Sequence, residues 1–308
     1  MHLTTTSQRA LVMVTLVSLL GVLGVSAAAQ ADAAPRAAKG KRVAAAVTRV
    51  DRPAAARAMW VWDTSDPAGV VALATSRGIG QLYAAVPPNV GTSAQLAELR
   101  ELVGLADAAG LRVDALGGDV GWVDDPAWVV SNWLKPAMAT GLFTGVHVDM
   151  EPYNTPAWTK SRKTVVKKYL AALDAFQVAA GATPIEADIP FWFDEVPANG
   201  STFDREIMKR TDAVTVMAYR RLADGPDGTI ALSANEIRSG AALGVKVRIG
   251  QETNHLGDDP TSVKQTFHGQ TLTQMETQLR LVTAAYDGSA GFAGLAIHDA
   301  IGYAAITD

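Results

Sequence analysis

The segment FTGVHVDMEPY (143–153) combines two carboxylates at a spacing that could support acid catalysis. Asp149 and Glu151 are two residues apart, so in a β-strand their side chains lie on the same face, one above the other. Two carboxyl groups held close together do not both ionise easily, and the pKa of one rises toward neutral pH. Glu151 is therefore a candidate general acid, with Asp149 as its supporting carboxylate.

Five further polar residues occupy comparable places along the chain. Each stands in, or directly after, an apolar run that is rich in β-branched residues, near the C-terminal end of that run. Alternation along a strand places polar residues on the face opposite the apolar ones. Carboxylate, phenol, guanidinium and imidazole groups in such places could bind a substrate or act as a second catalytic group. These residues are Asp188, Tyr219, Arg220, Glu252 and His298.

Ion pairing is the structural alternative for these carboxylates, because a buried charge needs a partner. It applies to Glu252 and to three inward-facing carboxylates, Asp114, Glu186 and Asp188. The arginines available to them are Arg112, Arg220 and Arg248.

Aromatic residues follow the same runs. Flat apolar rings with a polar edge stack on sugar faces, so substrate contacts are predicted, with loop packing as the alternative, for Trp62, Trp122, Tyr153 and Trp192. Packing within or near helices is predicted for Trp128, Trp133 and Trp158.

The elements that position these residues form a regular alternation. Eight units of strand and helix in about 250 residues predict a single-domain (β/α)8 TIM barrel of the α/β class, with its chemistry at the C-terminal ends of the strands. A doubly wound open sheet is the alternative, but DTSDPAG, which follows the first strand, does not fit a glycine-rich phosphate loop. Strands are predicted at 58–63, 79–86, 111–117, 144–151, 183–190, 212–219, 245–252 and 291–298.

Helices are predicted between these strands. Two of them are expected to begin with capping boxes, formed by Ser233 with Glu236 and by Thr273 with Glu276. The predicted helices cover 67–77, 93–109, 126–139, 158–180, 203–210, 234–243, 273–286 and 300–306.

The first chemistry-bearing segment resembles the fourth strand of family 18 chitinases and endoglucosaminidases, whose pattern is D-x-x-D-x-D-x-E. VMAY (216–219) resembles the sixth-strand M-x-Y of that family. The resemblance implies that Glu151 is the acid, that Asp149 handles the substrate acetamide and that Tyr219 supports the intermediate. His298 stands near the place of the family's eighth-strand tryptophan.

A second resemblance is to clan A retaining glycosidases, which carry an acid/base Glu followed by Pro at the end of strand 4 and a nucleophilic Glu at the end of strand 7. Glu151–Pro152 and Glu252 match these two places, although Met150 stands where that clan usually has Asn. Thr144 and His147 replace two of the four acidic positions of the family 18 pattern. This difference favours Glu252 as nucleophile.

A third resemblance, over residues 58–303, is to a group of uncharacterised secreted barrels of the glycosidase superfamily. Together the resemblances imply a glycoside hydrolase that acts on a polysaccharide or glycan and uses no cofactor or metal. A catalytically inactive, carbohydrate-binding barrel similar to chitinase-like lectins is one alternative. A metal-dependent hydrolase using His147, Asp149 and His298 is another, although strand 1 lacks the H-x-H of such barrels.

The N-terminal residues predict export. Residues 10–25 form an apolar run after a weakly basic start, and A-x-A patterns follow, as in a secretory signal peptide. A membrane anchor is the alternative, but the run is short for a span. We therefore expect a signal peptide at 1–31 and a secreted, extracellular protein.

Residues 32–57 are rich in alanine and hold seven basic and two acidic side chains, which predicts a disordered linker before a catalytic barrel at 58–308. Such a basic linker could contact anionic cell-wall polymers. From residue 58 onward, acidic side chains outnumber basic ones by ten, which argues against nucleic acid as a partner. We expect a monomer with a carbohydrate substrate.

Overall fold

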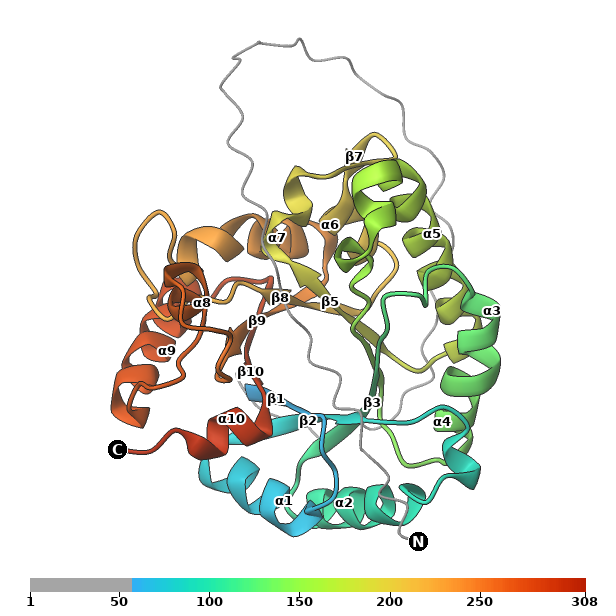
Figure 1. Cartoon of the computed structure of the whole chain (residues 1–308), viewed down its shortest axis with the longest axis horizontal. Helices are drawn as coiled ribbons and strands as arrows, with labels where there is room; N and C mark the ends of the chain where they lie inside the picture. Colours follow the sequence, from blue (N-terminus) through green and yellow to red (C-terminus); the bar gives the residue numbers. More distant parts are fainter. Residues whose placement is uncertain (1–56) are drawn as a thin grey trace, which may run out of the picture. The chain divides into compact units, whose positions relative to one another are not determined.

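Residues 57–308 form a closed barrel of eight parallel strands surrounded by helices in the computed structural model, which describes these residues (Figure 1). The strands neighbour one another around the barrel in the order β1-β10-β9-β8-β5-β4-β3-β2. The predicted (β/α)8 fold is confirmed. The predicted signal peptide lies outside the described residues, as does the predicted linker except for Arg57, which begins β1.

All eight predicted barrel strands are present, and each lies within its predicted range or extends one residue beyond it. They are β1 (Arg57–Val61), β2 (Ile79–Ala85), β3 (Arg112–Gly117), β4 (Val146–Val148), β5 (Ile185–Pro190), β8 (Ala213–Met217), β9 (Lys246–Glu252) and β10 (Phe292–His298). A small hairpin of β6 (Pro197–Ala198) and β7 (Ser201–Thr202) follows β5 outside the barrel.

The α-helices are α1 (Pro67–Ser76), α2 (Leu96–Ala108), α3 (Pro126–Val129), α4 (Lys135–Ala139), α5 (Pro156–Ala180), α6 (Phe203–Met208), α7 (Thr229–Leu243), α8 (Pro260–Gln265), α9 (Leu272–Tyr286) and α10 (Ala300–Ala305). Short 3-10 segments are η1 (Val90–Thr92), η3 (Pro152–Asn154) and η4 (Phe191–Glu195), and a π-helical turn, η2 (Val130–Leu134), joins α3 to α4. Within residues 57–308, no helix has the length and apolar character that a membrane crossing requires.

Both predicted capping boxes are wrong. Helix α7 begins at Thr229, so Ser233 lies inside it and its hydroxyl donates to the carbonyl oxygen of Thr229. Helix α9 is capped by Thr271 with Gln274, two residues before the predicted position. A Ser or Thr three residues before a Glu also occurs within helices, where the hydroxyl bonds back to the preceding turn.

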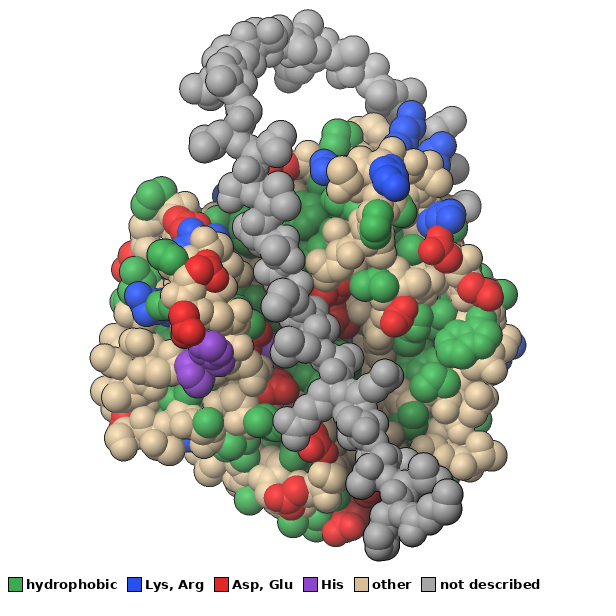
Figure 2. Space-filling model, viewed as in Figure 1, with side chains coloured by type: hydrophobic (Ala, Val, Ile, Leu, Met, Phe, Trp, Pro, Cys, Tyr) green, Lys and Arg blue, Asp and Glu red, His purple; other side chains and the backbone are tan. Residues whose placement is uncertain are grey.

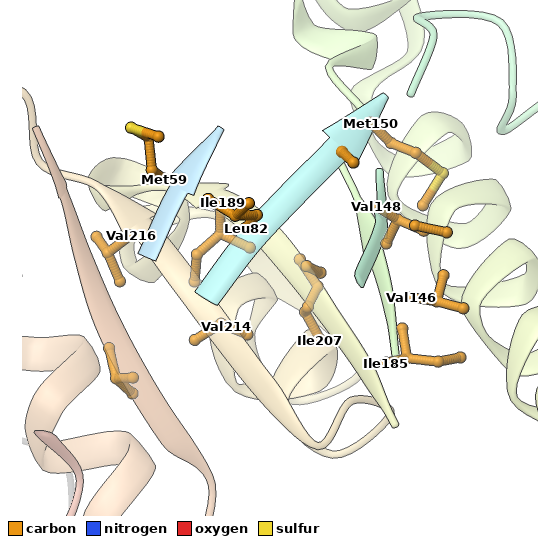
Figure 3. Packing of buried hydrophobic residues seen from close by; sticks show 14 of the residues in the cluster. Met59, Leu82, Val146, Val148, Met150, Ile185, Ile189, Ile207, Val214 and Val216 are labelled. Atoms are coloured by element: carbon orange, nitrogen blue, oxygen red, sulfur yellow. The ribbon is translucent and has the colours of Figure 1, made fainter. Parts of the chain in front are cut away.

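The alternation of each strand sorts its side chains between two cores. Val146, Val148 and Met150 extend from β4 toward the surrounding helices, in the same layer as the apolar side chains of β5 and β8 (Figure 3). The opposite parity fills the interior of the barrel, where Trp60 and Tyr83 meet edge to face at 5.3 Å between ring centroids. The interior is therefore aromatic and polar rather than aliphatic, and it supports the mouth from below.

Candidate active site

The two carboxylates of the FTGVHVDMEPY segment lie where β4 ends, at the C-terminal mouth of the barrel. The backbone turns directly afterwards into η3, which brings two of its polar side chains back to Glu151. The hydroxyl of Tyr153 donates to Oε1 of Glu151, and the amide of Asn154 donates to Oε2 at 2.8 Å. Asp149 has a buried Oδ1 atom with no hydrogen-bond partner within the described residues.

Burial and neighbouring charge raise the pKa of both carboxyl groups. Burial raises the pKa of Asp149 well above its ordinary value, and the charges of Glu151 and Asp188 raise it further. Burial also raises the pKa of Glu151; the Tyr153 hydrogen bond opposes this effect and the charge of Asp188 adds to it. Both carboxyl groups therefore keep a proton to a higher pH than ordinary carboxyl groups do, which is the property required of a general acid.

Glu252, at the end of β9, points inward as predicted but is enclosed by its own hydrogen bonds. Its Oε1 atom accepts from the backbone N–H groups of Thr253 and Asn254 at 2.8 and 2.7 Å and from the Asn254 side-chain amide at 3.0 Å. Its Oε2 atom lies 2.9 Å from Nδ1 of His298. The residue is 3% exposed. Its partner is thus His298 rather than either arginine of the ion-pair alternative.

His298, at the end of β10, links Glu252 to the rim of the mouth. The indole N–H of Trp62 donates to Nε2 of His298 at 3.0 Å, while Nδ1 faces Glu252. Burial alone would lower the pKa of His298, but the charge and hydrogen bond of Glu252 raise it to about 9. Because an indole can only donate, the Trp62 bond requires a neutral ring with its proton on Nδ1. A pKa of about 9 means that His298 carries both ring protons at neutral pH, where Nε2 cannot accept from Trp62, so this hydrogen bond belongs to the neutral ring above about pH 9.

Asp188, from β5, follows the residue that pairs with Val148 of β4, so it lies level with Asp149, and it is 1% exposed. Its Oδ2 atom accepts from the indole of Trp60 at 3.1 Å and lies 2.8 Å from Nε2 of His147, while its Oδ1 atom is buried without a partner among the described residues. His147 also stacks on Tyr83 at 3.7 Å between ring centroids. His147 is thus a hydrogen-bonded residue of the barrel interior, as expected for a layer below the mouth.

The other interior carboxylates follow the ion-pair alternative. Asp114 pairs with Arg112 at 3.0 Å and accepts from the hydroxyl of Thr144 at 2.7 Å. Glu186 lies 3.6 Å from Arg248. These two carboxylates therefore stabilise the barrel interior.

Tyr219 and Arg220, which follow β8, have different surroundings. Tyr219 stays at the mouth, with its ring 6.1 Å from that of His298, and burial with the charge of Glu252 raises its pKa well above the usual value. Arg220 is buried, donates twice to Asp227 at 3.0 and 2.8 Å, and lies over the ring of Phe191. A substrate contact by Arg220 stays a prediction, and this arginine is already paired.

Two of the predicted sugar-stacking residues form an aromatic group beside the acid. Tyr153 meets Trp192 edge to face at 5.4 Å, and Trp192 meets Trp158 at 5.7 Å. Tyr153 and Trp192 are both half-buried. This packing fixes the Tyr153 hydroxyl that holds Glu151, while their contacts with substrate stay a prediction.

A cleft of about 570 Å³ opens between the segments that follow β1, β2 and β3. Four indoles line it, those of Trp62, Trp122, Trp128 and Trp133. Trp122 is nearly buried and packs against Trp133 at 4.7 Å between centroids. The expectation that Trp128 packs in the core is wrong, because this residue is 44% exposed at the cleft. The sequence spacing of Trp128 and Trp133 gave no indication that both side chains line the same cleft.

Within the described part of the chain, no group of three or more His, Asp or Glu side chains is arranged to hold a metal ion.

Comparison with known proteins supports the fold. No family model and no curated protein sequence matches the chain. A family 18 chitinase from Cycas revoluta in complex with (GlcNAc)3 superimposes with a TM-score of 0.51 and 14% identity, covering 80% of this chain and 96% of the chitinase. A family 113 β-1,4-mannanase superimposes with a TM-score of 0.54 and 10% identity, covering 79% and 87%. The chain has the barrel fold of these glycoside hydrolases.

Proposed function

We propose that this glycoside-hydrolase-type barrel cleaves glycosidic bonds, with Glu151 as general acid. The observation that carries the proposal is the pair of neighbouring carboxyl groups, Asp149 and Glu151, that follows β4 and in which both pKa values are raised. A proton retained on this pair is available to the leaving-group oxygen of a glycosidic bond. The fold shared with a chitinase bound to an N-acetylglucosamine oligomer supports a carbohydrate substrate.

The substrate's own acetamide fits the site better as nucleophile than Glu252 does. An attacking carboxylate needs an oxygen open to the anomeric carbon, but Glu252 is 3% exposed, its Oε1 atom accepts three hydrogen bonds and its Oε2 atom faces His298. Asp149 instead has a buried oxygen atom without a partner in the described chain, which suits an acetamide N–H. This feature supports an acetamide-assisted reaction of an N-acetylated sugar.

The steps follow from these roles. The acetamide carbonyl oxygen attacks the anomeric carbon while Glu151 gives its proton to the leaving oxygen, and Asp149 accepts from the acetamide N–H. Water, losing a proton to Glu151, then opens the cyclic intermediate and restores the acid. In this scheme Tyr219 supports the intermediate, and Glu252 positions His298 and, through it, Trp62.

Three substitutions test these roles on an N-acetylglucosamine oligomer. Glu151→Gln should lower kcat about 10²–10⁴-fold, as expected for loss of a general acid, while oligomer binding persists. Asp149→Asn should also lower kcat strongly, whereas Glu252→Gln should retain much more activity. Glu195→Gln, an exposed carboxylate in η4 at the same end of the barrel, is the matched control and should leave kcat unchanged.

Three outcomes would contradict the scheme. An active Glu151→Gln variant, measured with a poor leaving group, would remove the acid assignment. Azide rescue of an inactive Glu252→Ala variant, with a glycosyl azide as product, would restore Glu252 as the nucleophile. A wild-type chain that binds oligomers without cleaving them would support the inactive carbohydrate-binding barrel.

We also propose that the chain is exported and acts outside the cell. The apolar run at 10–25 and the A-x-A patterns after it support cleavage before the linker. N-terminal sequencing of the secreted protein should find a first residue between about 28 and 35. Recovery of the protein from membranes with Met1 intact would contradict export.

A further inference from the structure

The aromatic cleft adjoins the mouth of the barrel at two places, one beside His298 and one beside Asp149. Trp62 lines the cleft and donates its indole N–H to His298 at the mouth. Gly118, also in the lining, lies so close to β4 that an added Cβ would stand 1.8 Å from the carbonyl oxygen of Asp149. A chain of sugar units held at the acid pair could therefore continue into the cleft.

The indoles of the cleft are held by the protein, which suits a preformed binding surface. Trp133 donates its N–H to the carbonyl oxygen of Val86 at 2.9 Å and supports Trp122. Trp62 is 36% exposed and lies in contact with His298, and Trp128 is exposed on the first turn of α3. Open indole faces bind the apolar faces of sugar rings and attract cations.

All the charged side chains that line the cleft are negative. Its lining contains two carboxylates, Asp119 and Asp125, and no Lys or Arg among the described residues. Each carboxylate is oriented by its own loop, because Asp119 accepts from the N–H of Gly121 at 2.7 Å and Asp125 from that of Trp128 at 3.0 Å. On the face shown in Figure 2, Lys and Arg gather instead over α5. The cleft therefore favours a cationic ligand over an anionic one.

We propose that this cleft binds amine-bearing sugar units, so that the substrate is a partly deacetylated hexosamine polymer. The proposal rests on the glycosidase function above: an N-acetylated unit occupies the acid pair, while neighbouring units with free ammonium groups lie between the indoles and the two aspartates. Acidic polysaccharides are disfavoured, because their carboxylates would meet Asp119 and Asp125 without a compensating cation.

The test measures binding to full-length Glu151→Gln protein by calorimetry, with tetramers of glucosamine and of N-acetylglucosamine as probes. The glucosamine tetramer should bind about three- to tenfold more tightly at low salt, a range expected for one or two exposed ion pairs, and high salt should remove the difference. Asp119→Asn combined with Asp125→Asn should abolish the preference. Trp128→Ala should weaken the binding of both tetramers.

Asp124→Asn is the matched control, because it removes the same charge from the same loop but lies outside the cleft, beside Lys168. The Asp124→Asn variant should still bind the glucosamine tetramer more tightly than the N-acetylglucosamine tetramer. Equal affinities for the two tetramers, or a preference that survives the double substitution, would overturn the proposal. Failure of the catalytic function would look different: the wild type would cleave no oligomer, while the preference for the glucosamine tetramer would remain.

Discussion

At the scale of residues, the carboxylates of the barrel differ in how many hydrogen bonds and ion pairs they make with the protein. Glu252 is surrounded by donors and Asp114 is paired with Arg112, whereas Asp149 keeps an unpartnered oxygen and Glu151 is held by neutral groups. Neutral donors position a carboxyl group without the strong lowering of its pKa that an arginine would cause. This difference in partners separates the carboxylates that we propose as catalytic from those that are paired within the protein.

The pH dependence of the activity should therefore change when Asp188 is replaced, because the negative charge of Asp188 raises the pKa of Asp149 and of Glu151. Asp188→Asn removes that charge, so the acid should lose its proton at a lower pH. The alkaline limb of kcat/KM against pH, which reports the free enzyme, should move to lower pH. Asp107→Asn, an exposed substitution in α2, should leave the limb in place. A limb that is unmoved or shifted upward would contradict this assignment.

The sequence predicted which residues face the mouth but not their partners. Strand parity correctly directed Asp149, Glu252 and His298 inward, because alternation is a local property of the backbone. The bond between Glu252 and His298 joins residues 46 positions apart, and no local pattern reports it. The departures of Thr144 and His147 from the family 18 pattern favour Glu252 as nucleophile, but a comparison of positions contains no information about the hydrogen bonds of Glu252.

At the scale of elements, the strands were easier to predict than the starts of the helices. Period-two alternation of β-branched residues marks each strand along its whole length, whereas a helix start depends on a few capping residues. Glu236 illustrates the difference. The sequence predicts that Glu236 belongs to a capping box at the start of a helix. In the structure it lies in the middle of α7, fully buried, and its carboxylate has no hydrogen-bond partner on another described residue.

This buried carboxyl group should make α7 sensitive to pH. Burial raises the pKa of Glu236 from 4.5 to about 9, so between these values the folded chain keeps a proton that the unfolded chain releases. The free energy of unfolding therefore falls as pH rises through this range. Glu236→Gln stays neutral and should raise the free energy of unfolding at pH 8 by about 1–3 kcal/mol, with little change at pH 4.

Thermal unfolding at the two pH values measures the effect. Glu206→Gln in α6 gives a contrast of opposite sign, because Lys209 and Arg210 pair with Glu206 and lower its pKa against the effect of burial. That variant should lose stability at pH 8. A Glu236→Gln protein that is less stable than wild type at pH 8 would contradict the buried, protonated state.

At the scale of the whole barrel, closure depends on β1 meeting β10. Arg57, the first described residue, donates to both oxygens of Glu276 in α9 at 2.6 and 2.7 Å and lies beside Tyr303 in α10. Burial alone would raise the pKa of Glu276, but the hydrogen bond and charge of Arg57 lower it. This bidentate contact between a guanidinium and a carboxylate holds the start of β1, the strand that completes the barrel.

Arg57→Ala should therefore lower the free energy of unfolding by about 1–3 kcal/mol, and with it the Tm by several degrees. Lys168→Ala, which breaks the more exposed ion pair with Asp124, should change stability by at most about 1 kcal/mol. Calorimetry of the two variants beside the wild type measures both effects. Equal losses would mean that Arg57 contributes no more than a surface charge.

The π-helical turn between α3 and α4 determines which side chains reach the aromatic cleft. In a regular helix, Trp128 and Trp133 would differ by about 500°, or about 140° around the axis, and would face different sides. The wider winding of Val130–Leu134 lets both indoles line one cleft. Single π-helical turns inside α-helices are frequent at functional sites. Deletion of Ser131 should restore regular winding and turn one of the two tryptophans out of the cleft, which loss of tetramer binding by an otherwise folded variant would measure.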